Sequence, residues 1–557
     1  MASHDVVSFA LDVQREYDPS QPLLIDANHP DRSLNGAQIS LLVRTLIAGL
    51  TAQGLEKGDC VLVNMGNNVL YPPLFLAIIG AGGVYIGSNP RIPPDEVDQM
   101  VKLSRARWII TEQDSLSTIK GIADKNRINH IFIIDEADIT TTIAVIQGTI
   151  SLLPQANSDP TSFLSLLNFG TGDPVLIADE EMARSTPAAL YTTSGTTGLP
   201  KAAVLSHASF ISQHHSIVGT SPPPYAIRRL VCLPFYHGFS AVFTHLFPVR
   251  YGYPFYILPD FQLPVFLRAV QRYAITETYL VPAMIYILNQ APEGLQVSIA
   301  LASMRYIGIS GAPIDPAAMA YLQDNHLHPH ACAGQIWGMT ETALVFQNRY
   351  PASGRREDQG DLRSIGTLAT RWEVKIGEAK KEASIQELVP GQLYVRGPGL
   401  VSGYLGHTEP FVDSQGWFAT GDLAYVDEKQ QYFILGRTKE LIKVRGYSIS
   451  PGEIENVLLK HPGIADAAVM GITLPDGTSE APRAYVVQGE DIKLTSHQVY
   501  EFVQQQMASY KTLDGGVVFV ESIPRTVTGK VRRGELTRLN GRREALAGLL
   551  GGRGHSG

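Results

Sequence analysis

The sequence predicts an α/β protein: a large N-terminal domain with parallel sheets, then a β-rich subdomain and a small α+β C-terminal domain. Three observations predict this fold class. Apolar runs alternate with helical patterns, the pattern changes near residue 360, and a second compact unit begins after Gly436. The chain of 557 residues also exceeds the length that one hydrophobic core normally supports, so at least two domains are expected.

The parallel sheets are predicted from short runs that are apolar at successive positions. These runs occupy residues 60–66, 107–112, 130–136 and 305–311. Strands that are apolar on both faces suit a parallel sheet covered by helices on each side. Residues 39–54 have helical periodicity and end in glycine, which predicts one of the covering helices.

One segment, residues 69–87, is apolar enough to suggest a membrane span. Pro72, Pro73 and the glycines at 80–83 interrupt it, so we expect a buried helix that runs into a strand. The N-terminus lacks the basic start and apolar core of a secretory signal, and the C-terminus lacks a peroxisomal SKL sequence. We therefore expect a cytoplasmic protein with no integral membrane association.

The second half of the chain has two successive patterns of predicted secondary structure. From about residue 360, short strands separated by turns predict the β-rich subdomain. After Gly436 we expect a helix at 451–462, strands at 466–472 and 483–489, a helix around 496–508 and a strand at 516–522.

Charge and cysteine usage exclude some classes of protein. The chain has 45 Lys and Arg against 53 Asp and Glu, a net charge of −8, and no long basic run, so a nucleic-acid partner is not expected. Cys60, Cys232 and Cys332 are too far apart for a disulfide framework or a zinc motif.

The stretch "YTTSGTTGLPK" (residues 191–201) has the composition of a phosphate-binding loop. Gly195 and Gly198 let the backbone approach an anion, hydroxyl and N–H groups can donate to phosphate oxygens, and Lys201 supplies positive charge. The Walker A spacing is absent, which disfavours a P-loop ATPase. On its own, the stretch is also compatible with a surface turn.

Four further motifs follow in order: "GQIWGMTE" (334–341), "TGD" (420–422), "GRTKELIKVRGYSISPGEIE" (436–455) and "PRTVTGK" (524–530). Together with the first loop, they resemble the adenylate-forming superfamily of acyl- and aryl-CoA ligases, firefly luciferases and nonribosomal-peptide adenylation domains. "LPFYHGFSAVFT" (233–244) is similar to the branch of 4-coumarate–CoA ligases and luciferases in particular.

The resemblance implies an ATP site. The loop would close over the β- and γ-phosphates, Glu341 would hold Mg²⁺, and Asp422 would accept hydrogen bonds from the ribose hydroxyls. The full set of implied nucleotide-binding residues is Thr193, Ser194, Gly195, Thr196, Thr197, Gly198, Lys201, Gln335, Ile336, Trp337, Gly338, Thr340, Asp422, Arg437 and Lys530. Lys530, His237, Lys201 and Thr340 are the implied catalytic residues, with Lys530 bridging the carboxylate and the α-phosphate.

The implied reaction has two halves. A substrate carboxylate attacks the α-phosphorus and expels pyrophosphate, and coenzyme A then displaces AMP from the acyl-adenylate. The resemblance implies an N-terminal domain at 1–436, a hinge at 437–439 around Lys439, and a mobile C-terminal domain at 440–557. Rotation about the hinge would replace Lys530 by a CoA-binding segment with Lys443, Arg445 and Gly446. Ser448 and Asp260 depart from the family pattern for CoA contacts.

The acyl pocket is expected around His237. The residues that the resemblance places there are Tyr236, His237, Phe239, Ser240, Ile309, Gly311, Ala312 and Ile336. Ile336 stands where coumarate ligases and luciferases generally have glycine, so its branched side chain should shorten the pocket. Residues 233–247 contain no carboxylate that could pair with a substrate ammonium, which disfavours α-amino acids.

The leading hypothesis is therefore an acyl- or aryl-CoA ligase in secondary, fatty-acid or aromatic-acid metabolism, using ATP, Mg²⁺ and coenzyme A on a small carboxylic acid. Two alternatives stay open: loading of a separate carrier protein, and a luciferase-like oxidation of the adenylate. In "HLHPHAC" (326–332), three histidines and a cysteine alternate, but Pro329 favours a loop leading into a strand over a metal site.

Overall fold

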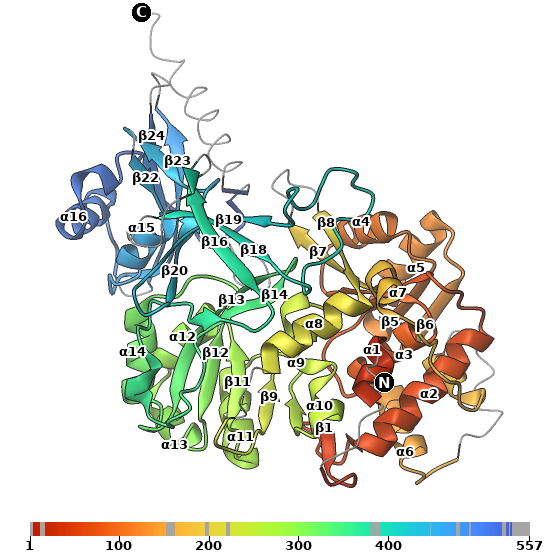
Figure 1. Ribbon diagram of the computed structural model, residues 1–557. Helices are drawn as coiled ribbons and strands as arrows, with labels where there is room; N and C mark the ends of the chain where they lie inside the picture. Colours follow the sequence, from red (N-terminus) through yellow and green to blue (C-terminus); the bar gives the residue numbers. More distant parts are fainter. Residues whose placement is uncertain are drawn as a thin grey trace, which may run out of the picture.

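The sheets and helices of the protein form a large N-terminal part and a smaller C-terminal unit, drawn in blue in Figure 1. The computed structural model describes residues 4–11, 17–151, 162–194, 200–218, 223–378, 381–382, 390–445, 447–474, 479–489, 492–525, 531–533 and 535–536. The N-terminal part contains two largely parallel sheets and one antiparallel sheet.

The first parallel sheet carries the start of the phosphate loop at one edge. Its strands lie in the order β6 (His130–Ile134), β5 (Trp108–Glu112), β3 (Cys60–Asn64), β4 (Val84–Ser88), β7 (Pro187–Ser194) and β8 (Pro200–Ser206). All neighbours are parallel except β7 and β8, which form an antiparallel pair. The predicted strands at 60–66, 107–112 and 130–136 are confirmed as β3, β5 and β6.

The second sheet lies under the C-terminal unit in Figure 1. Its strand order is β15 (Thr367–Leu368), β14 (Ala343–Gln347), β13 (Cys332–Met339), β12 (Tyr306–Ile309), β11 (Glu277–Leu280), β9 (Arg229–Val231), β10 (Phe255–Ile257), β1 (Pro22–Asp26) and β2 (Ser33–Asn35). The run from β13 to β1 is parallel, and the predicted strand at 305–311 is β12.

Helices cover the two parallel sheets. They are α1 (Val6–Leu11), α2 (Gly36–Ala52), α3 (Tyr71–Gly80), α4 (Pro94–Ser104), α5 (Leu116–Asn126), α6 (Glu136–Ile146), α7 (Glu180–Ser185), α8 (His207–Val218), α9 (Gly238–Thr244), α10 (Phe247–Tyr251), α11 (Leu263–Tyr273), α12 (Pro282–Asn289), α13 (Val297–Ala300) and α14 (Pro316–Asn325).

Local sequence explains where two of these helices begin. Asn35 caps α2, because its side chain accepts a hydrogen bond from the backbone N–H of Gln38. The Gln38 side chain in turn accepts from the backbone N–H of Asn35, which completes a capping box. Helix α3 has prolines in its first turn, where a missing N–H costs nothing, and all of its residues are buried. The prediction of a buried helix running into a strand at 69–87 is thus confirmed by α3 and β4. In the described part of the chain, no helix is both long and apolar enough to cross a membrane.

The β-rich subdomain is an antiparallel sheet in the order β17 (Lys381–Glu382), β16 (Glu373–Glu378), β18 (Gly391–Arg396), β19 (Phe418–Val426) and β20 (Tyr432–Arg437). The C-terminal unit contains a hairpin of β21 (Ile442–Val444) and β22 (Tyr447–Ile449) and a sheet of β23 (Ile464–Thr473), β24 (Glu480–Gln488) and β25 (Val517–Phe519). Its helices are α15 (Pro451–Leu458) and α16 (Ser496–Gln506). Both predicted units are confirmed.

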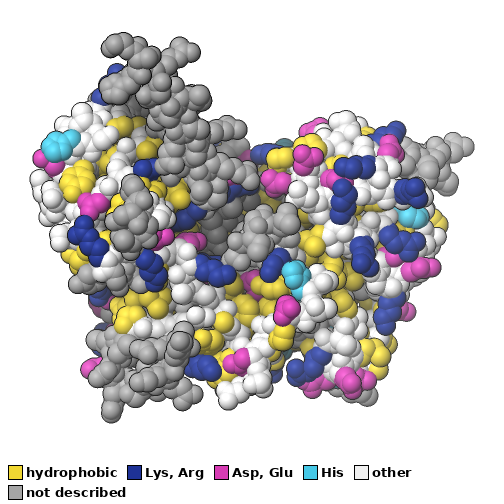
Figure 2. All heavy atoms as spheres, turned by 90° about the horizontal axis from the view of Figure 1, so that it is seen from above, with side chains coloured by type: hydrophobic (Ala, Val, Ile, Leu, Met, Phe, Trp, Pro, Cys, Tyr) yellow, Lys and Arg dark blue, Asp and Glu magenta, His cyan; other side chains and the backbone are white. Residues whose placement is uncertain are grey.

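On the face shown in Figure 2, basic and acidic side chains are interspersed over both the C-terminal unit and the N-terminal part.

Candidate active site

The phosphate loop connects β7 to β8, and its two ends are held by the pairing of these strands. Thr193 lies opposite Lys201 in the register. Residues 195–199, which include the predicted Gly195, Thr196, Thr197 and Gly198, lie outside the described residues, as does the side chain of Ser194. The structure therefore places the two ends of the predicted loop next to each other, with the lysine at the start of β8.

Lys201 lies beside Tyr404, a residue that the sequence analysis did not identify. Its ammonium is 4.9 Å from the centre of the Tyr404 ring, because Ala203 of β8 forms a bridge to Tyr404. The Tyr404 hydroxyl donates to the Glu341 carboxylate at 2.6 Å. Burial, followed by the Glu341 charge, raises the pKa of Tyr404, so the hydroxyl keeps its proton and stays a donor.

Glu341 is 3% exposed and follows strand β13. Across the described residues, no group of three His, Cys, Asp or Glu is placed to hold a metal, and this includes His328 and His330. A single carboxylate nevertheless fits Mg²⁺, which protein sites often bind through one or two carboxylates, water and substrate phosphates. Glu341 is therefore suited to hold the ion only together with a nucleotide.

The second polar cluster is centred on Asp422, which is 4% exposed. Arg437 lies opposite Asp422 in the β19–β20 register, with Nε 3.1 Å from Oδ1. The indole N–H of Trp337 donates to Oδ2 at 3.1 Å. The Arg437 charge also acts on Tyr404, so the two clusters are neighbours. Asp422, Trp337 and Arg437, predicted to bind the ribose and the adenine, are thus brought together.

Strand β13 supplies the predicted residues 335–338, and Thr340 follows its last residue, Met339. The Gln335 amide donates to the carbonyl of Leu362 at 2.8 Å, so it anchors a neighbouring loop. At Gly338, a Cβ atom would lie 1.7 Å from the carbonyl oxygen of Ala343, so only glycine fits. Thr340 is partly buried directly before Glu341.

His237 is the N-cap of helix α9, where its Nδ1 accepts from the N–H of Phe239 at 3.3 Å. This cap sets the start of α9, which carries the predicted pocket residues Phe239 and Ser240. Tyr236 precedes the cap, and its burial raises its pKa to about 12 despite the nearby Arg91. Ile309 is buried at the end of β12, and Gly311 and Ala312 are partly buried just beyond it.

A cavity lies next to these residues. It is lined by Arg229, Leu230, Val231, Leu233, Phe239, Ser240, Phe243, Thr244 and Tyr279. Phe239 and Ser240 belong to the predicted acyl pocket, whereas the other residues were missed. The ring of Tyr279 also reaches the predicted wall, because a Cβ on Gly308 would meet both Tyr279 and Ile336 within 2.8 Å.

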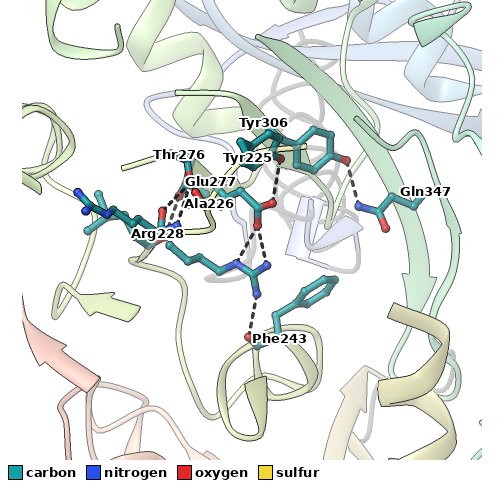
Figure 3. A network of polar contacts seen from close by, with 11 residues as sticks. Tyr225, Ala226, Arg228, Phe243, Thr276, Glu277, Tyr306 and Gln347 are labelled. Carbon is teal, nitrogen blue, oxygen red and sulfur yellow. Dashed lines mark hydrogen bonds and ion pairs between the residues drawn. The ribbon is translucent and has the colours of Figure 1, made fainter. Parts of the chain in front are cut away.

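One of the lining residues, Arg229, forms a buried ion pair with Glu277. The Arg229 side chain is 3% exposed and that of Glu277 is 6% exposed, and the guanidinium is 2.6 Å from the carboxylate. Tyr225 donates to the other Glu277 oxygen at 2.9 Å, and Figure 3 shows these two side chains pointing toward one another. A signal for this pair was present in the sequence: the strands "RLV" and "ETYL" each contain a single charged residue. Because a buried charge needs a partner, two such strands can indicate a buried ion pair.

The remaining predicted residues lie toward the C-terminal unit. Lys439 is exposed on the connection from β20 to β21, Lys443 is exposed within β21, and Arg445 is exposed with a φ of 47°. Backbone N–H groups of Lys443 and Arg445 donate to Glu480 and Ser479. Gly446, Lys530 and the side chain of Ser448 lie outside the described residues.

The fold and these two polar clusters define an adenylate-forming enzyme, which is the predicted class. The sequence profile described as "AMP-binding enzyme" matches residues 11–405, and that described as "AMP-binding enzyme C-terminal domain" matches residues 453–530. The chain belongs to the AMP-binding enzyme family.

Comparison with known proteins gives the same class. The chain is 45% identical to nicotinic acid-CoA ligase olcI of Penicillium canescens, over 98% of this chain and 99% of the relative. It is 44% identical to nicotinic acid-CoA ligase pyr1 of Aspergillus fumigatus, over 98% of both chains. ATP-bound MatB from Rhodopseudomonas palustris has the same fold, with a TM-score of 0.78, 24% identity and coverage of 96% and 98% of the two chains.

The predicted enzyme class is therefore confirmed. The chain is an AMP-forming acid–thiol ligase, and acyl-CoA ligases of this family use ATP, Mg²⁺ and coenzyme A.

Proposed function

We propose that this ligase activates nicotinic acid, or a heteroaromatic carboxylic acid of similar size, and transfers the acyl group to coenzyme A. One observation carries the proposal. The cavity has three aromatic side chains in its lining, and these pack against one another: the Phe243 and Tyr279 rings lie 4.3 Å apart and the Phe239 and Phe243 rings 5.0 Å apart. An aromatic lining suits an aromatic acid once these rings move apart to admit it, and the names of the 45% and 44% identical relatives specify an acid of this kind.

The nucleotide would bind at the two polar clusters. Asp422 accepts from the ribose hydroxyls, while Trp337 and Arg437 fix the direction of its carboxylate. Lys201 lies where it can neutralise phosphate charge, and Glu341 would hold Mg²⁺, which offsets the remaining negative charge when bound. Tyr404 fixes the orientation of Glu341 through its short hydrogen bond.

The first reaction step needs positioning more than proton transfer. The acid carboxylate attacks the α-phosphorus, the bond from that phosphorus to the bridging oxygen breaks, and pyrophosphate leaves with the electron pair. Lys530 and Thr340 are proposed to donate to the oxygens that gain charge. The thiolate of coenzyme A then attacks the acyl carbon and AMP leaves.

The proposed hinge at 437–439 would separate these two steps. Arg437 holds Asp422 on the N-terminal side, while Lys439, two residues later, is exposed at the start of the C-terminal unit. Strand β20 ends at Arg437 and β21 begins at Ile442, so the proposed hinge would start at the last residue of β20 and lie before the β21–β22 hairpin.

A substrate panel tests the proposal. We expect pyrophosphate release from ATP with pyridine-3-carboxylate, and a pyridine-3-carbonyl thioester by mass spectrometry when coenzyme A is added. In a parallel experiment, carrier proteins that bear a phosphopantetheine group replace coenzyme A. If other carboxylic acids in a broad panel promote pyrophosphate release and heteroaromatic acids of this size do not, the proposed substrate class is wrong. If no acid does, the proposed function fails. If only carrier proteins are acylated, the proposed acceptor is wrong.

A further inference from the structure

The buried ion pair at the acyl cavity has more donors than the surrounding protein uses. The guanidinium of Arg229 has five N–H groups. Nε and Nη2 donate to one Glu277 oxygen, at 3.2 and 2.6 Å, and Nη1 donates to the carbonyl of Phe243 at 3.3 Å. Two N–H groups thus have no partner among the described residues, although the side chain is 3% exposed.

The surroundings of Arg229 offer these two groups little else. Phe247, Phe255 and Tyr279 place their rings 4.9–5.1 Å from the guanidinium carbon. Burial disfavours the charge, but Tyr279 and Glu277 outweigh this effect and raise the pKa of Arg229, so the guanidinium stays charged. Burying an ion pair costs several kcal/mol unless its remaining hydrogen-bonding groups are satisfied.

Arg229 borders the cavity. Arg229 and Tyr279 line it together with Phe239 and Ser240, which belong to the wall predicted for the acyl pocket. Glu277 and the Phe243 carbonyl hold Arg229 in place, and Tyr225 in turn holds Glu277. Figure 3 labels Glu277, Tyr225 and Phe243 in this network. A group fixed in this way keeps one geometry toward a ligand.

We propose that Arg229 donates a hydrogen bond to an acceptor atom in the ring of the acyl substrate, and that the enzyme thereby selects a ring nitrogen over the isosteric C–H. The inference rests on the proposed function, since it requires the acid to bind beside His237 with its ring in the cavity. An all-carbon ring would leave the buried N–H groups without a partner, which sites of this kind reject strongly.

The test compares pyridine-3-carboxylate with benzoate, which differ by one nitrogen. The readout is the ratio of the two kcat/KM values for pyrophosphate release, measured on the same preparation, so the fraction of folded enzyme cancels. For the wild-type enzyme we expect a preference for the pyridine acid of about 10- to 100-fold. In the triple variant Tyr225→Phe/Arg229→Met/Glu277→Met, which removes both charges together, the ratio should fall to about 1.

The neighbouring Arg228→Met is the matched control, because Arg228 is exposed and its guanidinium donates to the carbonyl of Tyr273. This variant should keep the wild-type ratio. A wild-type ratio of about 1, or an unchanged ratio in the triple variant, would overturn the inference and leave the proposed ligase activity intact. The wild-type ratio alone decides the matter if the triple variant does not fold. If neither these acids nor the broader panel promotes pyrophosphate release, the proposed function fails, and this inference fails with it.

Discussion

The nucleotide side and the acyl side of the site are built in different ways. On the nucleotide side, the predicted residues sit in contiguous motifs, such as Glu341 just after β13 and Asp422 within β19. On the acyl side, Arg229, Glu277 and Tyr279 come from two parallel strands that are separated by 45 residues or more and meet only in the folded sheet. Motifs common to a family can therefore be read along the chain, whereas the residues proposed to choose the substrate meet only through packing across it.

The largest effect should come from the nucleotide side, at the lysine predicted to bridge carboxylate and phosphate. Lys530→Ala should lower the rate of pyrophosphate release by about 100- to 1,000-fold, the usual cost of removing one group that stabilises transition-state charge. Thioester formation from supplied acyl-adenylate and coenzyme A should change much less. Lys460→Ala, an exposed lysine of the same unit, is the control. Equal loss in both half-reactions would show that the variant harms folding instead.

Asp422 offers a smaller and more specific effect on the same side. Asp422→Ala removes the acceptor for Trp337 and Arg437 and for the ribose, so the KM for ATP should rise by about 10- to 100-fold, the value of one or two hydrogen bonds to a charged group. The KM for the acid should stay within about threefold, a free-energy change below 1 kcal/mol. Trp337→Phe, which removes only the indole donor, should raise the KM for ATP less. A rise confined to the acid would place Asp422 on the wrong side of the site.

The comparison also explains how much the sequence could predict. The parallel strands, helix α3 running into β4, and the C-terminal unit followed from apolar periodicity, and the structure confirms them. The motif residues Asp422, Arg437 and Trp337 were predicted and do lie together. Tyr404 was missed because its hydrogen bond to Glu341 joins residues 63 positions apart. Arg229 and Glu277, 48 positions apart, were missed for the same reason, since a lone charge in a strand does not reveal its partner.

Ile336 tests the acyl side directly. Ile336→Gly should increase kcat/KM for acids bulkier than pyridine-3-carboxylate by about 10-fold, because the removed side chain meets Tyr279 across Gly308 at the predicted pocket wall. Stability should fall by a few kcal/mol, as is usual when a cavity is made. Ile285→Ala is the control, because Ile285 is fully buried in α12 and its truncation makes a comparable cavity elsewhere. If both variants, or neither, broaden acceptance, Ile336 does not limit the pocket.

The smallest effect concerns stability and leaves catalysis unchanged. Directly after α9, His245 is 1% exposed between Tyr71 and Phe75, and its burial lowers its pKa to about 3, although an interaction with Phe235 opposes the shift. An unfolded histidine has a pKa of about 6.5. Between these values the unfolded state binds the extra proton, so the stabilising contribution is complete above pH of about 6.5 and is lost progressively as the pH falls toward 3.

His245 should therefore make the packing behind α9 sensitive to acid. Between pH 6 and 4, this one proton lowers the free energy of unfolding by up to about 1.4 kcal/mol per pH unit. In urea titrations, His245→Gln should reduce this slope by about that amount, while His29→Gln, an exposed histidine, should leave it unchanged. His207, whose pKa burial lowers to about 4, adds a second contribution that persists in the variant. An unchanged slope in His245→Gln would mean that water reaches the ring, and the packing behind α9 would then be looser than its aromatic contacts indicate.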